Sequence, residues 1–254
     1  MSDDSRPSPA GRPRVTPVAA VIPAAGRGVR LGPGAPKALR TLGGTPMLVH
    51  AVRALAASRA VSLVVVVAPP DGAAEVKSLL DVHALPDRTD VLVVPGGESR
   101  QESVRLGLEA LPPGHDVVLV HDAARPLVPV DTVDAVIEAV RDGARAVVPA
   151  LPLADTVKQV EPATEPGAPE PVVATPDRSR LRAVQTPQGF DRATLVRAHE
   201  RVTDDVTDDA SMVEQLGERV VAVPGHEEAF KVTRPLDLVL AEAVLARRRL
   251  NDGF

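Results

Sequence analysis

The sequence predicts a doubly wound α/β domain built on a mostly parallel β-sheet, with one β-arm that protrudes from it. Three observations support this prediction. Continuous apolar runs recur along the chain, amphipathic stretches lie between them, and one long segment rich in Pro and Glu interrupts this alternation. Alternating strands and helices are typical of a parallel sheet covered by helices on both faces.

Six short runs rich in Val, Leu and Ala are the candidate strands. They are continuous rather than alternating, as expected when both faces of a sheet are covered. They occupy residues 18–22, 61–68, 91–94, 117–120, 146–150 and 220–223. We assign these runs to the core of the fold rather than to its chemistry.

Seven amphipathic stretches between and after these runs are the candidate helices. They occupy residues 47–58, 72–80, 98–110, 132–142, 192–201, 210–216 and 235–249.

The segment 155–177 departs from this rhythm, because it holds two short β-like pieces around a tip rich in Pro and Glu. Its prolines exclude a core helix. Loops of this length without structure are uncommon in compact domains. We therefore predict a β-arm over residues 151–183, within a single domain spanning residues 17–250. Residues 1–16 are rich in Pro, Ser and charge, and we expect a disordered tail there.

Composition excludes several classes of protein. The formal net charge of −5 argues against a nucleic-acid binder, and three Phe without Trp or Tyr argue against a base-stacking surface. The absence of Cys excludes disulfides and Cys-based zinc sites. No apolar run approaches the roughly 18 residues of a membrane span, and no secretory signal is recognisable. We expect a cytoplasmic protein that does not bind membranes.

A Gly-rich loop, PAAGRGVRLGPGAPKAL, occupies residues 23–39 after the first candidate strand. It lacks the third Gly of a dinucleotide fingerprint and the Gly-Lys-Ser/Thr of a Walker A loop. The small residues Ala24, Ala25, Gly26 and Gly28 would let backbone N–H groups approach an anion closely. Two cations later in the loop, Arg30 and Lys37, match a triphosphate better than a single phosphate.

Further motifs follow in order at residues 96–104 (GGESRQESV), 120–126 (VHDAARP), 155–158 (DTVK), 183–188 (AVQTPQ), 206–211 (VTDDAS) and 231–238 (KVTRPLDL). With the loop, they resemble the methylerythritol phosphate cytidylyltransferases of the non-mevalonate isoprenoid pathway. The resemblance implies a Rossmann-like nucleotidyltransferase fold. It also implies a CTP-dependent transferase activity.

The resemblance also implies roles for individual residues. Arg30 and Lys37 would stabilise the α-phosphorus of CTP, and Arg178 and Lys231 would be further catalytic cations. The phosphates and the base of CTP would contact Ala24, Ala25, Gly26, Gly28, Gly97 and Ser103. Ribose, metal and the acceptor alcohol would meet Asp122, Ala123 and Arg125. The acceptor, methylerythritol phosphate, would also contact Thr156, Thr186 and Thr207. In the family the arm crosses a homodimer, so Thr156 and Arg178 would serve the partner's site.

The implied reaction is in-line attack by a phosphate oxygen on the α-phosphorus of CTP. The nucleophile is already an anion, so no general base is required, and His121 is interpreted as a structural residue. Catalysis then rests on positioning and electrostatics, with Mg²⁺ as the divalent cation, held mainly by CTP phosphates.

Three alternatives stay open at the level of sequence. A ribitol 5-phosphate cytidylyltransferase would share nearly the same motifs. A GTP-using transferase fits less well, because Gly97 and Ser103 match a small pyrimidine pocket. A non-catalytic nucleotide-binding regulator would bind CTP without turnover.

Overall fold

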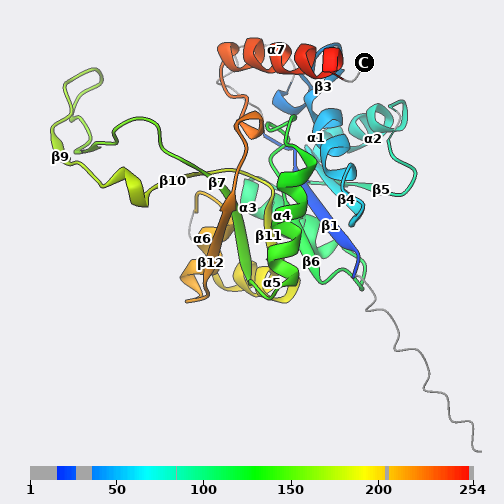
Figure 1. The fold of residues 1–254 in the computed structure, drawn as a ribbon. Coiled ribbons are helices and arrows are strands. Elements are labelled where there is room, and N and C mark those ends of the chain that lie inside the picture. Colours follow the sequence, from blue (N-terminus) through cyan, green and yellow to red (C-terminus); the bar gives the residue numbers. More distant parts are fainter. Residues whose placement is uncertain (1–15, 27–35, 84, 204–205, 252–254) are drawn as a thin grey trace, which may run out of the picture.

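The computed structural model describes residues 16–26, 36–83, 85–203 and 206–251. Almost the whole predicted tail (residues 1–16), together with Gly28 and Arg30, lies outside these ranges. The described residues form an eight-stranded sheet with helices on both faces (Figure 1). The predicted fold class is confirmed.

All six predicted strands are present. They are β1 (Val18–Pro23), β4 (Val61–Ala68), β5 (Asp90–Pro95), β6 (Val117–Val120), β7 (Ala146–Pro152) and β12 (Val220–Pro224). Neighbouring strands follow the order β10-β7-β11-β6-β1-β4-β5, and β12 also pairs with β7. The pairs β1–β4, β1–β6, β4–β5 and β7–β12 are parallel. The carboxyl ends of β1, β4, β5 and β6 therefore meet at one edge of the sheet.

Two strands of the sheet were not predicted from the sequence, β10 (Arg182–Val184) and β11 (Gln188–Asp191). β11 lies antiparallel between β6 and β7. It is short and contains Gly189, so it lacks the apolar signature of the other strands. A Cβ at Gly189 would lie 2.5 Å from Cγ1 of Val136 on the overlying helix. Close packing therefore explains the glycine within a central strand.

The helices divide between the two faces. One apolar core joins the sheet to α1 (Met47–Ala56), α2 (Ala73–Asp81) and α4 (Val130–Arg141). The other joins it to α3 (Arg100–Glu109), α5 (Arg192–Arg201) and α6 (Asp209–Gln215). The strand β1 serves both, because successive side chains point to opposite faces. Each predicted helix is present, with bounds that differ by at most two residues at either end.

The last helix, α7 (Pro235–Asn251), lies outside the two main layers (Figure 1). It packs on the hairpin formed by β2 (Thr41–Leu42) and β3 (Thr45–Pro46) through a third apolar cluster that includes Leu42, Met47 and Ala241. The backbone N–H of Gly43 in this hairpin donates to Oε1 of Glu242 at 2.7 Å. The segment before α7 is held beside the turn after β6, because the N–H of Val232 donates to the carbonyl of Ala124 at 2.8 Å. This segment contributes a residue to the pocket described below.

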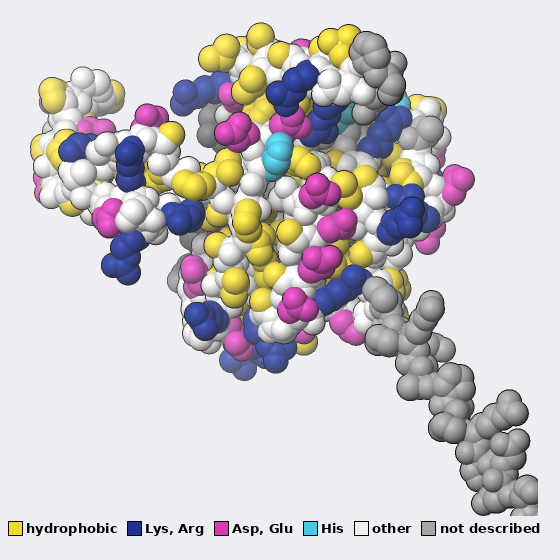
Figure 2. Space-filling view, in the orientation of Figure 1, with side chains coloured by type: hydrophobic (Ala, Val, Ile, Leu, Met, Phe, Trp, Pro, Cys, Tyr) yellow, Lys and Arg dark blue, Asp and Glu magenta, His cyan; other side chains and the backbone are white. Residues whose placement is uncertain are grey.

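The predicted arm projects away from the body of the molecule (Figure 1). It contains β8 (Gln159–Val160) and β9 (Val172–Ala174), which pair antiparallel, followed by a short 3-10 helix, η4 (Arg178–Arg180). Its tip closes with a hydrogen bond from the N–H of Glu161 to the carbonyl of Pro171 at 3.0 Å. The side chains of Val172 and Val173 are exposed, and the arm stands clear of the body in the space-filling view (Figure 2).

Candidate active site

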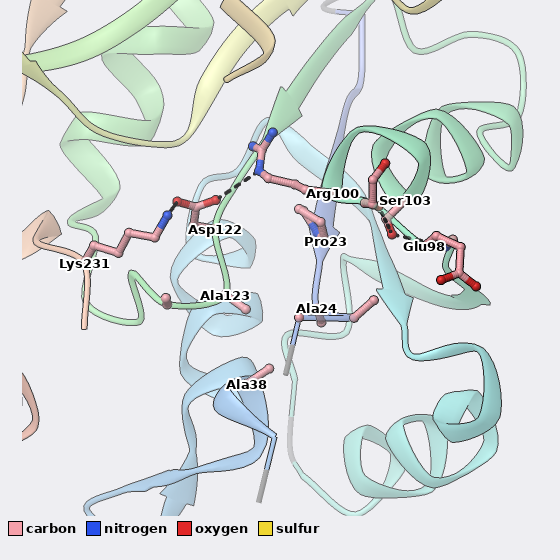
Figure 3. Close-up of a pocket in the computed structure, with 14 residues that line it drawn as sticks. Pro23, Ala24, Ala38, Glu98, Arg100, Ser103, Asp122, Ala123 and Lys231 are labelled. Atoms are coloured by element: carbon pink, nitrogen blue, oxygen red, sulfur yellow. Dashed lines mark hydrogen bonds and ion pairs between the residues drawn. The ribbon is translucent and has the colours of Figure 1, made fainter. Parts of the chain in front are cut away.

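A pocket of about 290 Å³ lies at the carboxyl edge of the sheet (Figure 3). The chain leaving β1, the corner between β5 and α3, the turn after β6 and the segment before α7 all reach it. Ligands of open α/β sheets bind at this edge. Eight residues predicted to form the site line the pocket: Ala24, Ala25, Gly26, Gly97, Ser103, Asp122, Ala123 and Lys231.

The Gly-rich loop contributes its first residues to one wall. Ala24 is buried, and its N–H donates to the carbonyl of Val67 at 2.8 Å, which fixes the start of the loop beside β4. Gly28 and Arg30 lie outside the described residues. Lys37 begins the 3-10 helix η2 (Lys37–Leu39), and the next residue, Ala38, lines the pocket. The predicted roles of Arg30 and Lys37 therefore remain predictions.

The corner before α3 depends on glycine and on side-chain hydrogen bonds. Ser103 Oγ accepts from the N–H of Gly97 at 3.2 Å and donates to the carbonyl of Ser99 at 2.9 Å. Ser99 also caps α3 by accepting from the N–H of Glu102, whose carboxylate accepts from the N–H of Glu98. These bonds resemble a capping box. In this structure the Ser103 hydroxyl thus holds the loop that forms the pocket wall.

Gly97 leaves room for the side chain of Glu102 at this corner. A Cβ at that position would lie 2.2 Å from Cδ of Glu102, a distance that real Cβ atoms do not reach. A larger residue would displace the Glu102 side chain and with it the hydrogen bond to Glu98.

Asp122 is surrounded by cations. Its Oδ2 lies 2.8 Å from Nζ of Lys231, and its Oδ1 lies 3.6 Å from Nε of Arg100 (Figure 3). Oδ2 also lies 3.8 Å from Nε of Arg125. Burial disfavours the ionised carboxylate. The positive charges of Lys231 and Arg100 outweigh that effect and hold the pKa of Asp122 well below its usual range. The pocket therefore contains a carboxylate that is ionised at neutral pH.

Residues below the pocket hold Asp122 in place. The backbone N–H of Asp122 donates to Oγ1 of Thr186 at 3.0 Å, and the same hydroxyl lies 3.0 Å from Nδ1 of His121. His121 is fully buried, and its Nε2 lies 3.1 Å from the carbonyl of Arg125. Burial lowers the pKa of His121 to about 4, so the ring is neutral at pH 7. These contacts give His121 a structural role, as interpreted from the sequence.

Two predicted site residues, Arg125 and Thr186, are thus placed beside or beneath the pocket rather than in its lining. Arg125 donates to the carbonyls of Ala229 at 2.7 Å and Val184 at 3.3 Å, so it ties together three segments around the site. Their predicted contacts with substrate remain predictions.

Three further predicted residues lie away from the pocket. Thr156 and Arg178 are exposed on the arm, where the guanidinium of Arg178 donates to the carbonyl of Ala154. Thr207 is exposed just before α6. The structure does not bring these three side chains together with Asp122 within one chain.

Sequence reasoning missed Arg100 and Asp209. Arg100 lines the pocket, and its Nη1 lies 2.8 Å from Oδ2 of Asp209. Asp209 is buried and pairs with Nε2 of His199 at 3.1 Å. Burial opposes ionisation of Asp209, but the hydrogen bond from His199 and the charge of Arg100 keep its pKa below the usual value. Both residues stood within quoted motifs, and only their neighbours in space revealed the pair.

The comparisons with known proteins show the family of this chain. The family model described as IspD, 2-C-methyl-D-erythritol 4-phosphate cytidylyltransferase, matches residues 18–247. This chain belongs to that family. A family relative from Streptomyces avermitilis is 87% identical over the whole of both chains, and one from Frankia casuarinae is 55% identical over 94% of this chain and 84% of the relative.

Solved structures of the family have the same fold. The 2-C-methyl-D-erythritol 4-phosphate cytidylyltransferase from Thermus thermophilus superposes with a TM-score of 0.67 at 37% identity, covering 89% of this chain and 97% of that one. The 4-diphosphocytidyl-2C-methyl-D-erythritol synthase from Anaerococcus prevotii superposes with a TM-score of 0.76 at 27% identity, covering 91% of this chain and 99% of that one. The predicted family and the predicted enzyme class, a cytidylyltransferase, are confirmed.

Within the described part of the chain, no helix is long and apolar enough to cross a membrane. In the same part of the chain, no group of three or more His, Asp or Glu side chains is arranged to hold a metal ion.

Proposed function

We propose that this chain transfers CMP from CTP to 2-C-methyl-D-erythritol 4-phosphate. The products are 4-diphosphocytidyl-2-C-methyl-D-erythritol and pyrophosphate. The single observation that carries the proposal is the pocket at the carboxyl edge of the sheet, where the Gly-rich loop, the Gly97 corner and Asp122 converge in a member of this family.

The chemistry is an in-line displacement. A phosphate oxygen of the acceptor forms a bond to the α-phosphorus of CTP while the bond from that phosphorus to the bridging oxygen of the β-phosphate breaks, and pyrophosphate leaves. Both reactants are anions, so the protein must offset their repulsion and orient them. Lys231 lines this pocket, and we assign to it the task of offsetting this repulsion. We assign Arg30, Lys37 and Arg178 to the same task.

The pocket suits a pyrimidine nucleotide with its phosphates toward the loop. The small residues Ala24, Ala25 and Gly26 permit close approach of backbone N–H groups to phosphate oxygens. The Gly97 corner would face the base. Ala123 would leave room for the ribose beside Asp122.

The donor chemistry of the pocket also fits Mg²⁺. Mg²⁺ is usually held by one or two carboxylates together with substrate phosphates, and the pocket lining offers the carboxylates of Asp122 and Glu98. Asp122 is the residue that would hold the ion. When bound, Mg²⁺ would neutralise charge on the triphosphate.

We further propose a homodimer formed through the arm. The arm exposes Val160, Val172 and Val173, which is an apolar surface that a second copy of the chain could bury. Thr156 and Arg178 lie on the arm rather than at the pocket of their own chain, and a partner's acceptor site would use them.

Pyrophosphate release tests the proposal. The purified chain is incubated with CTP, Mg²⁺ and either 2-C-methyl-D-erythritol 4-phosphate or ribitol 5-phosphate, and the product is identified by mass spectrometry. We expect turnover with the first acceptor and a much lower kcat/KM with the second. Preference for ribitol 5-phosphate would show that ribitol 5-phosphate is the acceptor, and CTP binding without turnover would support a regulator instead.

Sedimentation of the intact chain and of a chain lacking residues 159–174 tests the dimer.

A further inference from the structure

The guanidinium of Arg100 lies between two carboxylates that it does not approach equally. Its Nη1 is 2.8 Å from Oδ2 of Asp209, whereas its Nε is 3.6 Å from Oδ1 of Asp122. Figure 3 shows the contact between Arg100 and Asp122. Arg100 therefore makes a close ion pair with Asp209, away from the pocket, and a loose one with Asp122, which lines the pocket.

Asp209 is fixed in the interior, away from the pocket. Its side chain is 1% exposed, and Nε2 of His199, whose side chain is 2% exposed, lies 3.1 Å from its Oδ1. The start of α6 is fixed as well, because Asp208 accepts from Nε2 of Gln188 at 2.7 Å and the N–H of Ala210 donates to Oε1 of the same glutamine. Asp209 is thus a rigid anchor on a helix tied to the central strand β11.

The two oxygens of Asp122 are in different situations. Oδ2 is engaged by Lys231 at 2.8 Å, while the contact of Oδ1 with Arg100 is too long for a hydrogen bond. Oδ1 is thus the oxygen that a ligand can reach with the least loss of protein contacts. If Arg100 moved onto Asp122, a charge-assisted hydrogen bond would occupy this oxygen as well.

We propose that Asp209 is a positioning residue that withholds Arg100 from Asp122 and so leaves Oδ1 available to the Mg²⁺-bound nucleotide. The inference rests on the proposed function, because it takes CTP with Mg²⁺ as the ligand of the pocket. The closer pair of Arg100 with Asp209 keeps the carboxylate of Asp122 accessible from the pocket.

Nucleotide binding to the intact protein tests this role. Asp209→Asn keeps the shape of the side chain but removes its charge, which frees Arg100 to pair with Asp122. By titration calorimetry with CTP and excess Mg²⁺, we expect Asp209→Asn to bind about 10- to 100-fold more weakly, the loss typical when an outer partner of a metal-binding residue is removed. Glu218→Gln is the matched control, because it removes a carboxylate from the Arg197 ion pair outside the pocket lining.

Two comparisons separate positioning from a merely structural effect. The loss in Asp209→Asn should be much smaller for CTP without Mg²⁺, because the obstructed oxygen serves the metal. The double variant Arg100→Gln/Asp209→Asn should bind CTP with Mg²⁺ more tightly than Asp209→Asn alone, because the competing cation is gone. Equal losses with and without Mg²⁺, or a double variant no better than the single one, would overturn the proposal.

A structure of the unaltered chain with CTP and Mg²⁺ keeps the proposal testable if Asp209→Asn does not fold. We expect Arg100 to remain paired with Asp209 while Oδ1 of Asp122 faces the metal-bound nucleotide. Arg100 hydrogen-bonded to Asp122 in that complex would refute the inference. If the unaltered chain does not bind CTP, the proposed function fails too, whereas normal binding with an unaffected Asp209→Asn variant refutes this inference alone.

Discussion

Lys231 and Asp122 form an ion pair with 2.8 Å between Nζ and Oδ2, although 109 positions separate them in the chain (231 − 122). The carboxylate comes from the turn after a central strand, and the ammonium comes from the segment before the last helix (Figure 3). This pair lies in the lining of the pocket, and the charge of Lys231 helps to hold the pKa of Asp122 below its usual range.

Replacing Lys231 should impair catalysis more than folding. Lys231→Met removes a cation from the reacting phosphates and leaves Asp122 with weaker compensation. We expect kcat/KM for CTP to fall by about 10²- to 10³-fold, as when an electrostatic donor is removed from an active site. Lys77→Met is the control, because Lys77 makes an exposed pair with Asp81 on α2. Steady-state kinetics check this prediction, and a loss below threefold would contradict it.

Lys37→Ala tests the Gly-rich loop. We expect turnover to be lost while the free energy of unfolding, measured in urea, stays within about 0.5 kcal/mol of the unaltered protein. Retained turnover would remove Lys37 from the catalytic cations.

The hydroxyl of Thr186 should stabilise the fold through Asp122 and His121. Thr186→Val leaves the N–H of Asp122 without its acceptor in a buried place, which should lower the free energy of unfolding by about 1–3 kcal/mol. Thr156→Val, at an exposed position on the arm, is the matched control and should change it by less than about 0.5 kcal/mol. Denaturant titrations of both variants measure these values, and equal stabilities would contradict the assigned role.

Gly97→Ala should weaken nucleotide binding with little cost in stability. The added methyl group would displace Glu102 and release the N–H of Glu98, which opens the corner of the pocket. We expect a higher KM for CTP. Gly72→Ala is the control, since a Cβ there meets only Pro69 at ordinary contact distances. An unchanged KM in Gly97→Ala would show that the corner tolerates a side chain.

Burial of neutral His121 should reduce stability in mild acid. Its pKa is lowered to about 4 in the folded state from 6.5. Between these values the unfolded chain binds a proton that the native protein does not, so stability falls as the pH drops from 6.5 toward 4, by up to about 1.4 kcal/mol per pH unit. His121→Asn removes this contribution. Urea unfolding at several pH values should therefore show a shallower decline in the variant, and identical slopes would contradict the prediction.

The sequence by itself determined the layers of this protein and the identity of most pocket residues. Continuous Val-rich runs and amphipathic stretches are local patterns, and they suffice to predict six strands and seven helices. The ordered motifs predicted the family, and eight of the residues predicted to form the site line one pocket because parallel strands end at the same edge of the sheet.

Only the tertiary structure decided how those residues are coupled. β11 lacks the continuous apolar pattern of the other strands, because it is short and contains Gly189. Close packing against α4 explains this glycine, and the sequence does not show that contact. Thr186 and Ser103 were predicted to touch substrate, and this stays a prediction; the structure adds that their hydroxyls hold Asp122 and the Gly97 corner. The pairing of Arg100 with Asp209 joins the starts of two helices far apart in the chain. Ion pairs and buried hydrogen bonds of this kind depend on distances between segments, which no local pattern of residues encodes.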